Sequence, residues 1–312
     1  MTKAVFAIPG DLATPTGGYA YARRMLELLP REGIATRRIA LPGSYPDPSA
    51  ADLAGTAELM AAAPPDAVLL IDGLAYGAMP ADLIEGFRRP VVALVHHPLG
   101  LEAGLTPDRR AALLASEAAA LGLARRIVVT SPLTGRLLAS DFNVDGAVIA
   151  VAEPGTDPVG RSRGTGSPVH ILAVGAIAPR KGFDVLVAAL ALVPDRNWHL
   201  TIAGSADRDP KAAAALRASI VEAGLSSRVT LAGALEPAAL DLLYEAADIF
   251  VSPSLFEGYG MALAEALAWG LPIVASTGGA AAETVPDGAA IKIPPGGIAE
   301  LTAALTTLIA AP

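Results

Sequence analysis

The 312-residue sequence contains no cysteine, only four histidines and few aromatic residues, at 4%. The absence of cysteine excludes disulfides, thiolate metal sites and thiol redox chemistry. No continuous apolar run is long enough to span a bilayer. The N-terminus, residues 1–10, runs directly into a strand pattern and does not have the shape of a signal peptide. These absences favour a cytoplasmic protein.

Charge is also scarce, because only 17% of the residues are charged and the net charge is −8. This acidic balance argues against general nucleic-acid binding. Basic residues nevertheless cluster in or just after the first expected helix, at Arg23, Arg24, Arg31, Arg37 and Arg38. Such a cluster can serve as a face for an anionic acceptor or for acidic lipids, with peripheral contact at the inner membrane face through the N-terminal domain. A solvated helix face is the more common outcome, and we favour it.

Hydrophobic residues are abundant, at 53%, and they form short runs that alternate with helical patterns. Most runs are fully apolar, which is typical of parallel strands covered on both faces. The alternation predicts a doubly wound α/β architecture. Strands are expected at 4–8, 67–71, 91–95, 127–130, 148–151, 170–174, 199–203, 229–231, 249–252, 273–275 and 290–293. Helices are expected at 19–29, 50–62, 109–121, 183–192, 212–221, 238–246, 261–269 and 298–309.

One segment interrupts this alternation. Residues 153–168 are rich in glycine, proline and serine and have no periodicity, which indicates a linker. The length of the chain also favours two domains. We therefore expect a Rossmann-like N-terminal domain at 1–157, a linker at 158–168 and a Rossmann-like C-terminal domain at 169–312. Two such domains facing each other would bring the carboxyl ends of both sets of strands to a central cleft, the expected ligand site.

The segment 256–265 is the most informative for function. Glu257 lies in a glycine-rich loop after an expected strand, and Glu265 follows eight residues later in the next helix. Helix N-terminal amides suit a phosphate, and carboxylates on either side suit the hydroxyls of a nucleotide sugar. Eight helical residues would rise roughly 12 Å, although Glu257 is expected to precede the first turn. Both carboxylates can instead be solvated charges, but Glu265 interrupts an otherwise apolar helix and therefore needs partners.

Polar or glycine-rich motifs follow two expected strands of the N-terminal half. Gly17 and Gly18 permit close approach of the backbone to a ligand, although a glycine pair alone is a weak signal. His96 and His97 follow the strand at 91–95 and can bind metal, transfer protons or donate hydrogen bonds to a sugar. Metal is the least favoured of these, because no carboxylate stands at ligand spacing. We take His96 as the functional histidine.

In the C-terminal half, Arg180 and Lys181 precede an expected helix. Two cations at a helix N-terminus oppose its dipole unless an anion is present. This favours contact with a diphosphate over a surface pair that reaches a nearby carboxylate. Asp207 and Asp209 superficially resemble a metal-binding pair, but Pro210 and the helix that follows indicate a helix cap instead.

With these segments in view, the chain resembles a retaining glycosyltransferase of family 4, which has the GT-B fold of two Rossmann-like domains. The resemblance covers nearly the whole length. The most specific match is the segment 247–276, which contains the family's E-x7-E signature at Glu257 and Glu265. Further matching segments are Gly17-Gly18 and residues 91–96, 174–182, 278–279 and 283–288.

The resemblance implies a role for each matching position. Glu265 is expected to bind the nucleotide ribose, and Glu257 to approach the hydroxyls of the transferred sugar. Arg180 and Lys181 would neutralise the departing diphosphate, while His96 would lie near the donor sugar. The backbone groups expected to hold the donor belong to Gly17 and Gly18 of the other domain and to Gly258, Tyr259, Gly260 and Met261.

The resemblance also implies the reaction: a hexose moves from a nucleotide-diphosphate sugar to a hydroxyl of a saccharide, lipid or small-molecule acceptor. The anomeric configuration is retained, with no metal, other cofactor or protein nucleophile, because the leaving phosphate helps to remove the acceptor proton. The acceptor pocket is expected from the loops 43–49 and 99–106. The alternatives are a nucleotide-sugar epimerase of the same fold and a non-catalytic protein that binds nucleotide sugars.

Two features of the sequence depart from the family pattern. Ala176 stands where many members carry arginine, so Arg180 is expected to supply that charge. The family's final crossover helix is not found after the helix expected at 298–309, and the sequence ends at Pro312.

Overall fold

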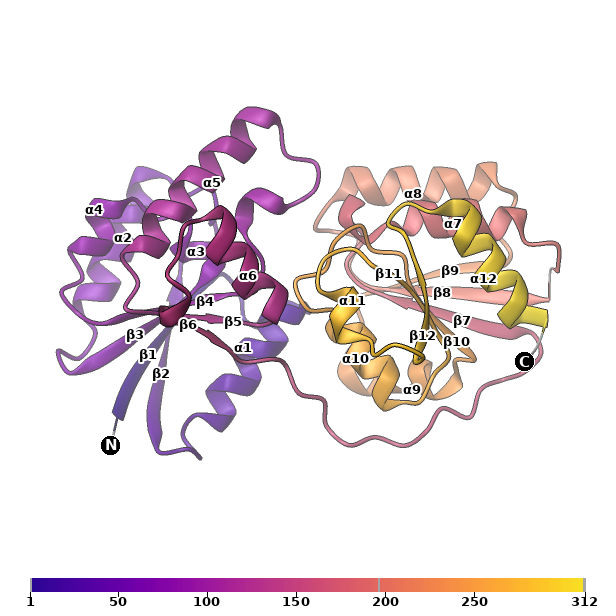
Figure 1. Cartoon of the computed structure of the whole chain (residues 1–312), viewed down its shortest axis with the longest axis horizontal. Helices are drawn as coiled ribbons and strands as arrows, with labels where there is room; N and C mark the ends of the chain where they lie inside the picture. The colour runs from indigo at the N-terminus through magenta and orange to yellow at the C-terminus, as the bar shows by residue number, and fades with distance from the viewer. Residues whose placement is uncertain (1, 196, 311–312) are drawn as a thin grey trace. The chain divides into compact units, whose positions relative to one another are not determined.

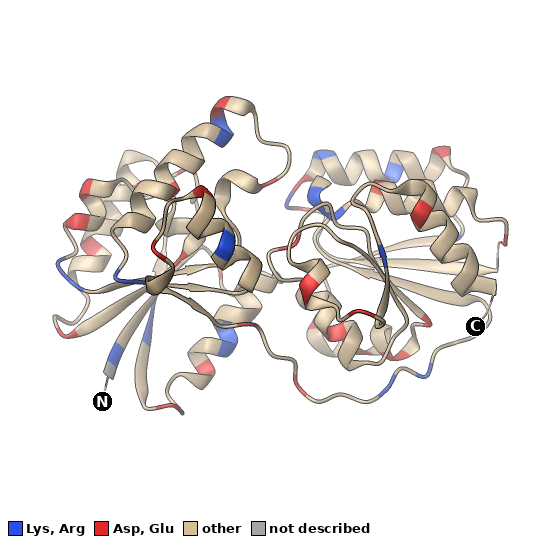
Figure 2. Ribbon diagram, viewed as in Figure 1, with Lys and Arg blue, Asp and Glu red and all other residues tan. Residues whose placement is uncertain are grey.

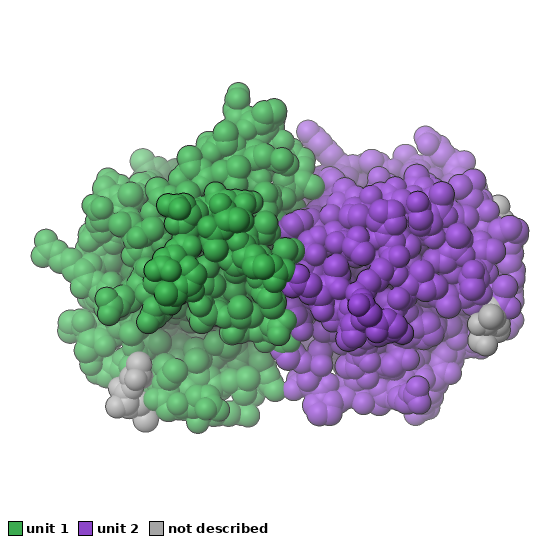
Figure 3. Space-filling view, in the orientation of Figure 1, with its two compact units in different colours: residues 1–154 green, residues 155–312 purple. Residues whose placement is uncertain are grey.

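A computed structural model of the chain describes residues 2–195 and 197–310. The chain divides into two compact units, unit 1 at Met1–Pro154 and unit 2 at Gly155–Pro312 (Figure 3). Each unit contains one six-stranded sheet, and every strand pair in both sheets is parallel. The doubly wound α/β architecture expected from the sequence is therefore confirmed.

Unit 1 has the strand order β2-β1-β3-β4-β5-β6. Figure 1 shows α2, α4 and α5 on one side of this sheet and α1 on the other. The strands are β1 (Thr2–Pro9), β2 (Ile34–Leu41), β3 (Ala67–Asp72), β4 (Val91–Val95), β5 (Arg126–Val129) and β6 (Ile149–Val151). The helices are α1 (Gly17–Leu28), α2 (Ala50–Ala61), α3 (Gly73–Tyr76), α4 (Ala81–Glu85), α5 (Pro107–Gly122) and α6 (Pro132–Asp141), with the 3-10 helices η1 (Leu99–Leu101) and η2 (Gly146–Val148).

Unit 2 has the strand order β12-β11-β10-β7-β8-β9. The strands are β7 (Val169–Val174), β8 (Trp198–Ala203), β9 (Val229–Gly233), β10 (Ile249–Ser252), β11 (Ile273–Ser276) and β12 (Ala290–Ile293). The helices are α7 (Phe183–Leu192), α8 (Pro210–Glu222), α9 (Pro237–Ala246), α10 (Met261–Ala268), α11 (Ala281–Thr284) and α12 (Ile298–Ala310), with the 3-10 helix η3 (Pro179–Lys181).

The sheet of unit 2 separates two hydrophobic cores. One core joins the strands to α7, α8 and α12, and it includes Phe183, Trp198 and Leu305. The other joins the opposite face to α9, α10 and α11, and it includes Tyr244 and Phe250. Figure 1 shows these two sets of helices on opposite sides of the sheet. Burial on both faces explains why the strands read as continuous apolar runs.

One strand, β2, is missing from the sequence prediction. It is an edge strand that pairs only with β1 and alternates between exposed and partly buried residues. Two residues assigned to the basic cluster near the first helix, Arg37 and Arg38, lie on this strand instead. In an edge strand that is covered on one face only, apolar and polar residues alternate. This pattern differs from the fully apolar runs by which the other strands were predicted.

Four arginines of the basic cluster have partners within unit 1. Arg24 and Arg31 pair with Glu27, while Arg23 and Arg38 donate to backbone carbonyls. Figure 2 shows acidic and basic residues interspersed over the helices and loops, with few on the strands. This arrangement fits the solvated-face interpretation. None of the described helices has both the length and the apolar character needed to cross a membrane.

The glycine- and proline-rich segment 158–168 belongs to unit 2, where its second half is anchored. The Asp248 carboxylate accepts hydrogen bonds from the backbone amides of Thr165, Gly166 and His170, at 3.0, 3.0 and 2.7 Å. Ser162 donates its hydroxyl to the carbonyls of α9 and the residue after it. Asp248 precedes β10 and fixes the course of the chain into β7.

Candidate functional site

The candidate site of unit 2 lies where the strand order reverses. Strand β7 is the first of its sheet in sequence, yet it lies between β10 and β8. The loops that follow β7 and β10 leave the same edge of the sheet in adjacent positions. Ligands of open α/β sheets bind at such a switch point, beyond the carboxyl ends of the strands. The cations expected after β7 and the first carboxylate expected after β10 therefore meet here.

Glu257 and the two cations form a buried ionic cluster. Lys181 Nζ lies 2.6 Å from Glu257 Oε1, and Arg180 Nη1 lies 3.3 Å from Oε2. The Ser254 hydroxyl donates to Oε1 at 2.6 Å. Glu257 is only 7% exposed. Burial alone would raise the pKa of Glu257, but the charges of Lys181 and Arg180 and the hydrogen bonds hold it at about 2. Glu257 is therefore a carboxylate at all ordinary pH values.

Glycines allow the two loops to pack this closely. Gly175 has φ +154°, and a Cβ there would lie 2.9 Å from Lys181 Cε, so its absence makes room for the lysine side chain. Gly182 has φ +62°, and a Cβ would lie 2.4 Å from the carbonyl oxygen of Pro253 in the other loop. The loops are also joined by hydrogen bonds from Leu255 N to Arg180 O and from Arg180 Nη1 to Phe256 O.

Behind Glu257, a second glycine pair holds its backbone. Glu257 donates its amide to Gly278 O at 3.1 Å and accepts from Ala280 N at 2.8 Å, and it forms a parallel bridge with Gly279. A Cβ on Gly279 would lie 2.3 Å from Glu257 O. The sequence placed Gly278 and Gly279 within the family pattern. The structure gives them the role of fixing the carboxylate from behind.

The anion that balances Arg180 and Lys181 is a protein group. Both residues lie in the 3-10 helix η3, and α7 begins only at Phe183. Two cations at this position therefore do not require a ligand anion, because Glu257 supplies the negative charge. The contact with a nearby carboxylate, which we considered less favoured, is the one present, although it is buried and not at the surface.

The second carboxylate, Glu265, also has a partner within unit 2. The hydroxyl of Tyr244 donates to Glu265 Oε2 at 2.8 Å. Burial raises the pKa of Glu265, the hydrogen bond from Tyr244 lowers it, and the charge of Asp241 raises it again. Helix α10 begins at Met261 after Gly260, which has φ +98°. Glu257 thus precedes the helix as expected, and the helical rise does not set its distance from Glu265.

The remaining expected donor groups lie between these carboxylates. Gly258 and Tyr259 belong to the loop after β10, Gly260 caps α10 and Met261 is its first residue. The first amides of a helix have no partners within it, so this end of α10 can receive an anion. Asp209, by contrast, caps α8, because its carboxylate accepts a hydrogen bond from Ala212 N at 2.9 Å, as expected.

Unit 1 has its own switch point, where β1 lies between β2 and β3. Gly17 and Gly18 open α1 there, and a Cβ on Gly18 would lie 3.5 Å from His96 Cδ2. His96 Nε2 is buried, has no hydrogen-bond partner among the described residues, and lies 3.5 Å from Asp72 Oδ2. The structure thus brings the glycine pair and His96 together. The sequence prediction missed Asp72, whose only signal is its place at the end of a strand.

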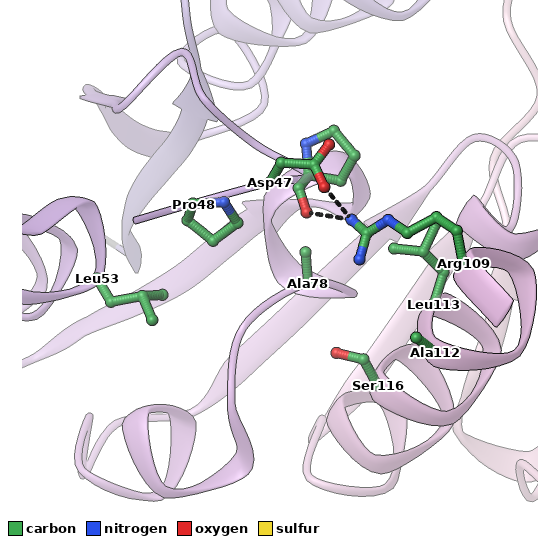
Figure 4. A pocket seen from close by; sticks show the side chains of 9 residues that line it. Asp47, Pro48, Leu53, Ala78, Arg109, Ala112, Leu113 and Ser116 are labelled. Atoms are coloured by element: carbon green, nitrogen blue, oxygen red, sulfur yellow. Dashed lines mark hydrogen bonds and ion pairs between the residues drawn. The ribbon is translucent and has the colours of Figure 1, made fainter. Parts of the chain in front are cut away.

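A pocket of about 330 Å³ opens in unit 1 beside the loop 43–49, one of the two loops expected to hold the acceptor. Figure 4 shows Arg109 of α5 pointing across it toward Asp47, with which it pairs at 2.5 Å. Leu53 and Ser116 line opposite walls. The size lies in the range of small-molecule sites. Among the described residues, no group of three or more histidines, aspartates and glutamates could hold a metal ion.

A buried carboxyl group, Glu117, supports the segment that follows the histidine pair. Its Oε2 accepts a hydrogen bond from Leu99 N at 2.8 Å, and the residue is 1% exposed. Its Oε1 has no partner among the described residues. Burial raises the pKa of Glu117 to about 8, against a smaller lowering by the bond from Leu99. The ionised form is therefore costly. No local pattern in the sequence indicates this, because Glu117 occupies an ordinary helical position.

This raised pKa predicts a stability that falls as pH rises. The folded chain holds the Glu117 proton between pH 4.5 and about 8, whereas the unfolded chain loses it near 4.5. The contribution of Glu117 is thus most favourable below pH 4.5 and is lost by about pH 8, with a loss on the order of a few kcal/mol. Glu117→Gln should be more stable than the parent at pH 8 and not at pH 5 in urea unfolding. An equal difference in stability between variant and parent at both pH values would contradict this. Glu58→Gln, at an exposed position, serves as the control.

Comparison with known proteins gives a family match to the C-terminal half of the chain. Residues 168–311 match the family described as glycosyl transferases group 1. A D-inositol 3-phosphate glycosyltransferase from Arthrobacter sp. (strain FB24) is 33% identical over 184 residues, which are 53% of this chain and 42% of that protein. The alignments to such curated relatives span between about a third and half of the relatives' length.

Solved structures show the same fold over almost the whole chain. The sucrose-phosphate synthase from Thermosynechococcus elongatus superposes with a TM-score of 0.82 at 23% identity, covering 99% of this chain and 90% of that one. The Anabaena protein HepE, solved with UDP and glucose, gives a TM-score of 0.77 at 19% identity and the same coverages. The chain therefore carries a group 1 glycosyl transferase domain on a GT-B fold, as the resemblance in its sequence implied.

Proposed function

We propose that the chain transfers a hexose from a nucleotide-diphosphate sugar to an acceptor hydroxyl, with retention of the anomeric configuration and without a metal. The observation that carries this proposal is the cluster of Glu257, Lys181 and Arg180 beside the start of α10. It lies at the switch point of a group 1 glycosyl transferase domain, where a nucleotide is expected.

The charge of the cluster suits a leaving diphosphate. Two cations face one carboxylate, so these three side chains together carry a net charge of +1. Both side chains are partly accessible, at 22% for Arg180 and 16% for Lys181. Charge on the diphosphate grows as its bond to the sugar breaks, and fixed cations in a water-poor site stabilise that growth. Lys181 and Arg180 thus supply the charge that a metal supplies elsewhere.

Glu257 has two roles in this proposal. It holds both cations in place before the donor binds, and it can accept a further hydrogen bond from the sugar. A carboxylate oxygen accepts about two hydrogen bonds. Among the described residues, Oε1 accepts hydrogen bonds from Lys181 and Ser254, whereas Oε2 accepts one from Arg180. One hydroxyl of the transferred sugar can therefore bind at Oε2, while Glu265 takes the ribose.

The reaction needs no nucleophile from the protein. The bond from the anomeric carbon to the diphosphate breaks, and the bond from that carbon to the acceptor oxygen forms on the same face. The acceptor proton passes to an oxygen of the leaving phosphate. The chain supplies positioning and electrostatic stabilisation. Gly17, Gly18 and His96 keep the predicted roles toward the donor. The Arg109 pocket is the candidate site for a small polyol or saccharide acceptor, in keeping with the name of the relative, a D-inositol 3-phosphate glycosyltransferase.

Radiolabelled donors test the proposal. The chain is incubated with UDP-, GDP- and ADP-hexoses, each with and without a panel of polyol and saccharide acceptors. We expect label in an acceptor product with one donor base, whose diphosphate also raises the apparent unfolding temperature. An isomerised donor without acceptor would indicate an epimerase instead. Tight binding without any product would indicate a non-catalytic binding protein.

A further inference from the structure

Tyr244 is held rigidly next to Glu265. It comes from α9, is 1% exposed, and its hydroxyl lies 2.8 Å from Glu265 Oε2 on α10. Its ring stacks on Phe250, with centroids 5.8 Å apart, and on Trp269, with centroids 6.4 Å apart and planes 8° from parallel. Two stacking partners from different elements fix the ring, so the position of the hydroxyl is fixed as well.

The hydroxyl has one proton and two acceptors in reach. The Glu265 carboxylate is nearer, at 2.8 Å, than the carbonyl of Ala262, at 3.3 Å. Burial, followed by the charge of Glu265, raises the pKa of Tyr244 well above its usual value. The phenol therefore stays protonated and donates to the carboxylate, since a charged acceptor gives the stronger bond.

The Glu265 carboxylate accepts no other hydrogen bond from the described residues. A carboxylate has about four acceptor positions, so three remain when Tyr244 uses one. Two adjacent ribose hydroxyls need two of them in a fixed direction. We infer that Tyr244 is a positioning residue for the nucleotide: it orients the Glu265 carboxylate toward the adjacent 2′- and 3′-hydroxyls of the donor ribose. This inference rests on the proposed function.

The hydrogen bond also favours the ionised form of Glu265. Burial and the charge of Asp241 both raise the pKa of Glu265, and the bond from Tyr244 opposes them. Tyr244 and Asp241, both from α9, are the groups that act on this carboxyl. Removal of the phenol hydroxyl raises the pKa of Glu265 further. The pH below which nucleotide binding weakens therefore moves upward.

Tyr244→Phe tests the inference, because it keeps the stacked ring and removes only the hydroxyl. We expect the Kd for a nucleoside diphosphate to rise about tenfold, as for loss of one hydrogen bond to a charged group. KM for the donor should rise equally with kcat nearly unchanged, because ribose contacts persist in the transition state. The matched control is Tyr76→Phe, which removes a buried hydroxyl bonded to Ala120 O at 2.7 Å in unit 1. Its Kd should stay within about twofold of the parent.

A 2′,3′-dideoxynucleoside diphosphate separates positioning from general damage. Parent and Tyr244→Phe should bind it equally weakly, and the pH midpoint for the ordinary ligand should be higher in the variant. The inference would be overturned if Tyr244→Phe lost equal affinity for both ligands. It would also be overturned if the variant bound the ordinary nucleoside diphosphate as tightly as the parent does. Failure of the parent chain itself to bind any nucleoside diphosphate would overturn the proposed function, and this inference with it.

Discussion

Replacing Lys181 by methionine should lower kcat by about 100- to 1,000-fold, the cost of removing one group that stabilises a developing anion. Donor affinity should fall much less, because the charge on the diphosphate is greatest in the transition state. The same change should reduce the free energy of unfolding by roughly 3 kcal/mol, since Glu257 loses one of two cations in a buried site. Single-turnover kinetics and urea unfolding measure the two effects.

A second substitution separates these effects. Glu257→Gln neutralises the carboxylate, so the double variant Lys181→Met/Glu257→Gln should recover most of the lost stability but not the lost turnover. Recovery of turnover in the double variant would mean that Lys181 serves only as the counter-ion of Glu257. Lys292→Met is a matched control in unit 2, because Lys292 pairs with the exposed Asp287 and lies outside the cluster. It should leave kcat unchanged.

Replacing Glu265 by alanine should weaken binding of a nucleoside diphosphate about 10- to 100-fold, the range for hydrogen bonds to a charged group. The fold should persist, because the Tyr244 hydroxyl still lies 3.3 Å from Ala262 O. Titration calorimetry with a nucleoside diphosphate and with inorganic pyrophosphate measures the effect. Pyrophosphate lacks the ribose, so the variant should bind it as the parent does.

The control for Glu265→Ala is Glu245→Ala. Glu245 pairs with the exposed Arg163 on the same unit, at 3.0 Å, and its loss should leave nucleotide binding unchanged. Equal weakening of nucleoside diphosphate and pyrophosphate by Glu265→Ala would contradict a ribose role. Such a result would place the effect of Glu265 in the phosphate site or in the fold of α10.

The sequence was most informative about elements with a local signal. Fully apolar runs such as Val91–Val95 predicted strands correctly, because burial on both faces leaves a pattern within a few residues. The edge strand Ile34–Leu41 lacks that pattern and was missed. Asp209 was correctly interpreted as a cap because its partner lies three residues away.

Contacts between distant segments were not predictable in the same way. Lys181 and Glu257 are 76 residues apart, and they meet because β10 pairs with β7, which no local pattern specifies. The sequence did show that Glu265, in an apolar helix, needs a partner. It did not identify Tyr244, which reads as one more apolar position on its own helix. The roles of these residues toward a ligand remain predictions.

The most direct measurement is a crystal structure of the chain with a nucleoside diphosphate bound. We predict the ribose hydroxyls within hydrogen-bond distance of Glu265, the phosphates against the amides of residues 258–261, and Lys181 Nζ in contact with a phosphate oxygen. A nucleotide bound elsewhere, or one at α10 with its ribose turned away from Glu265, would contradict the proposed donor site.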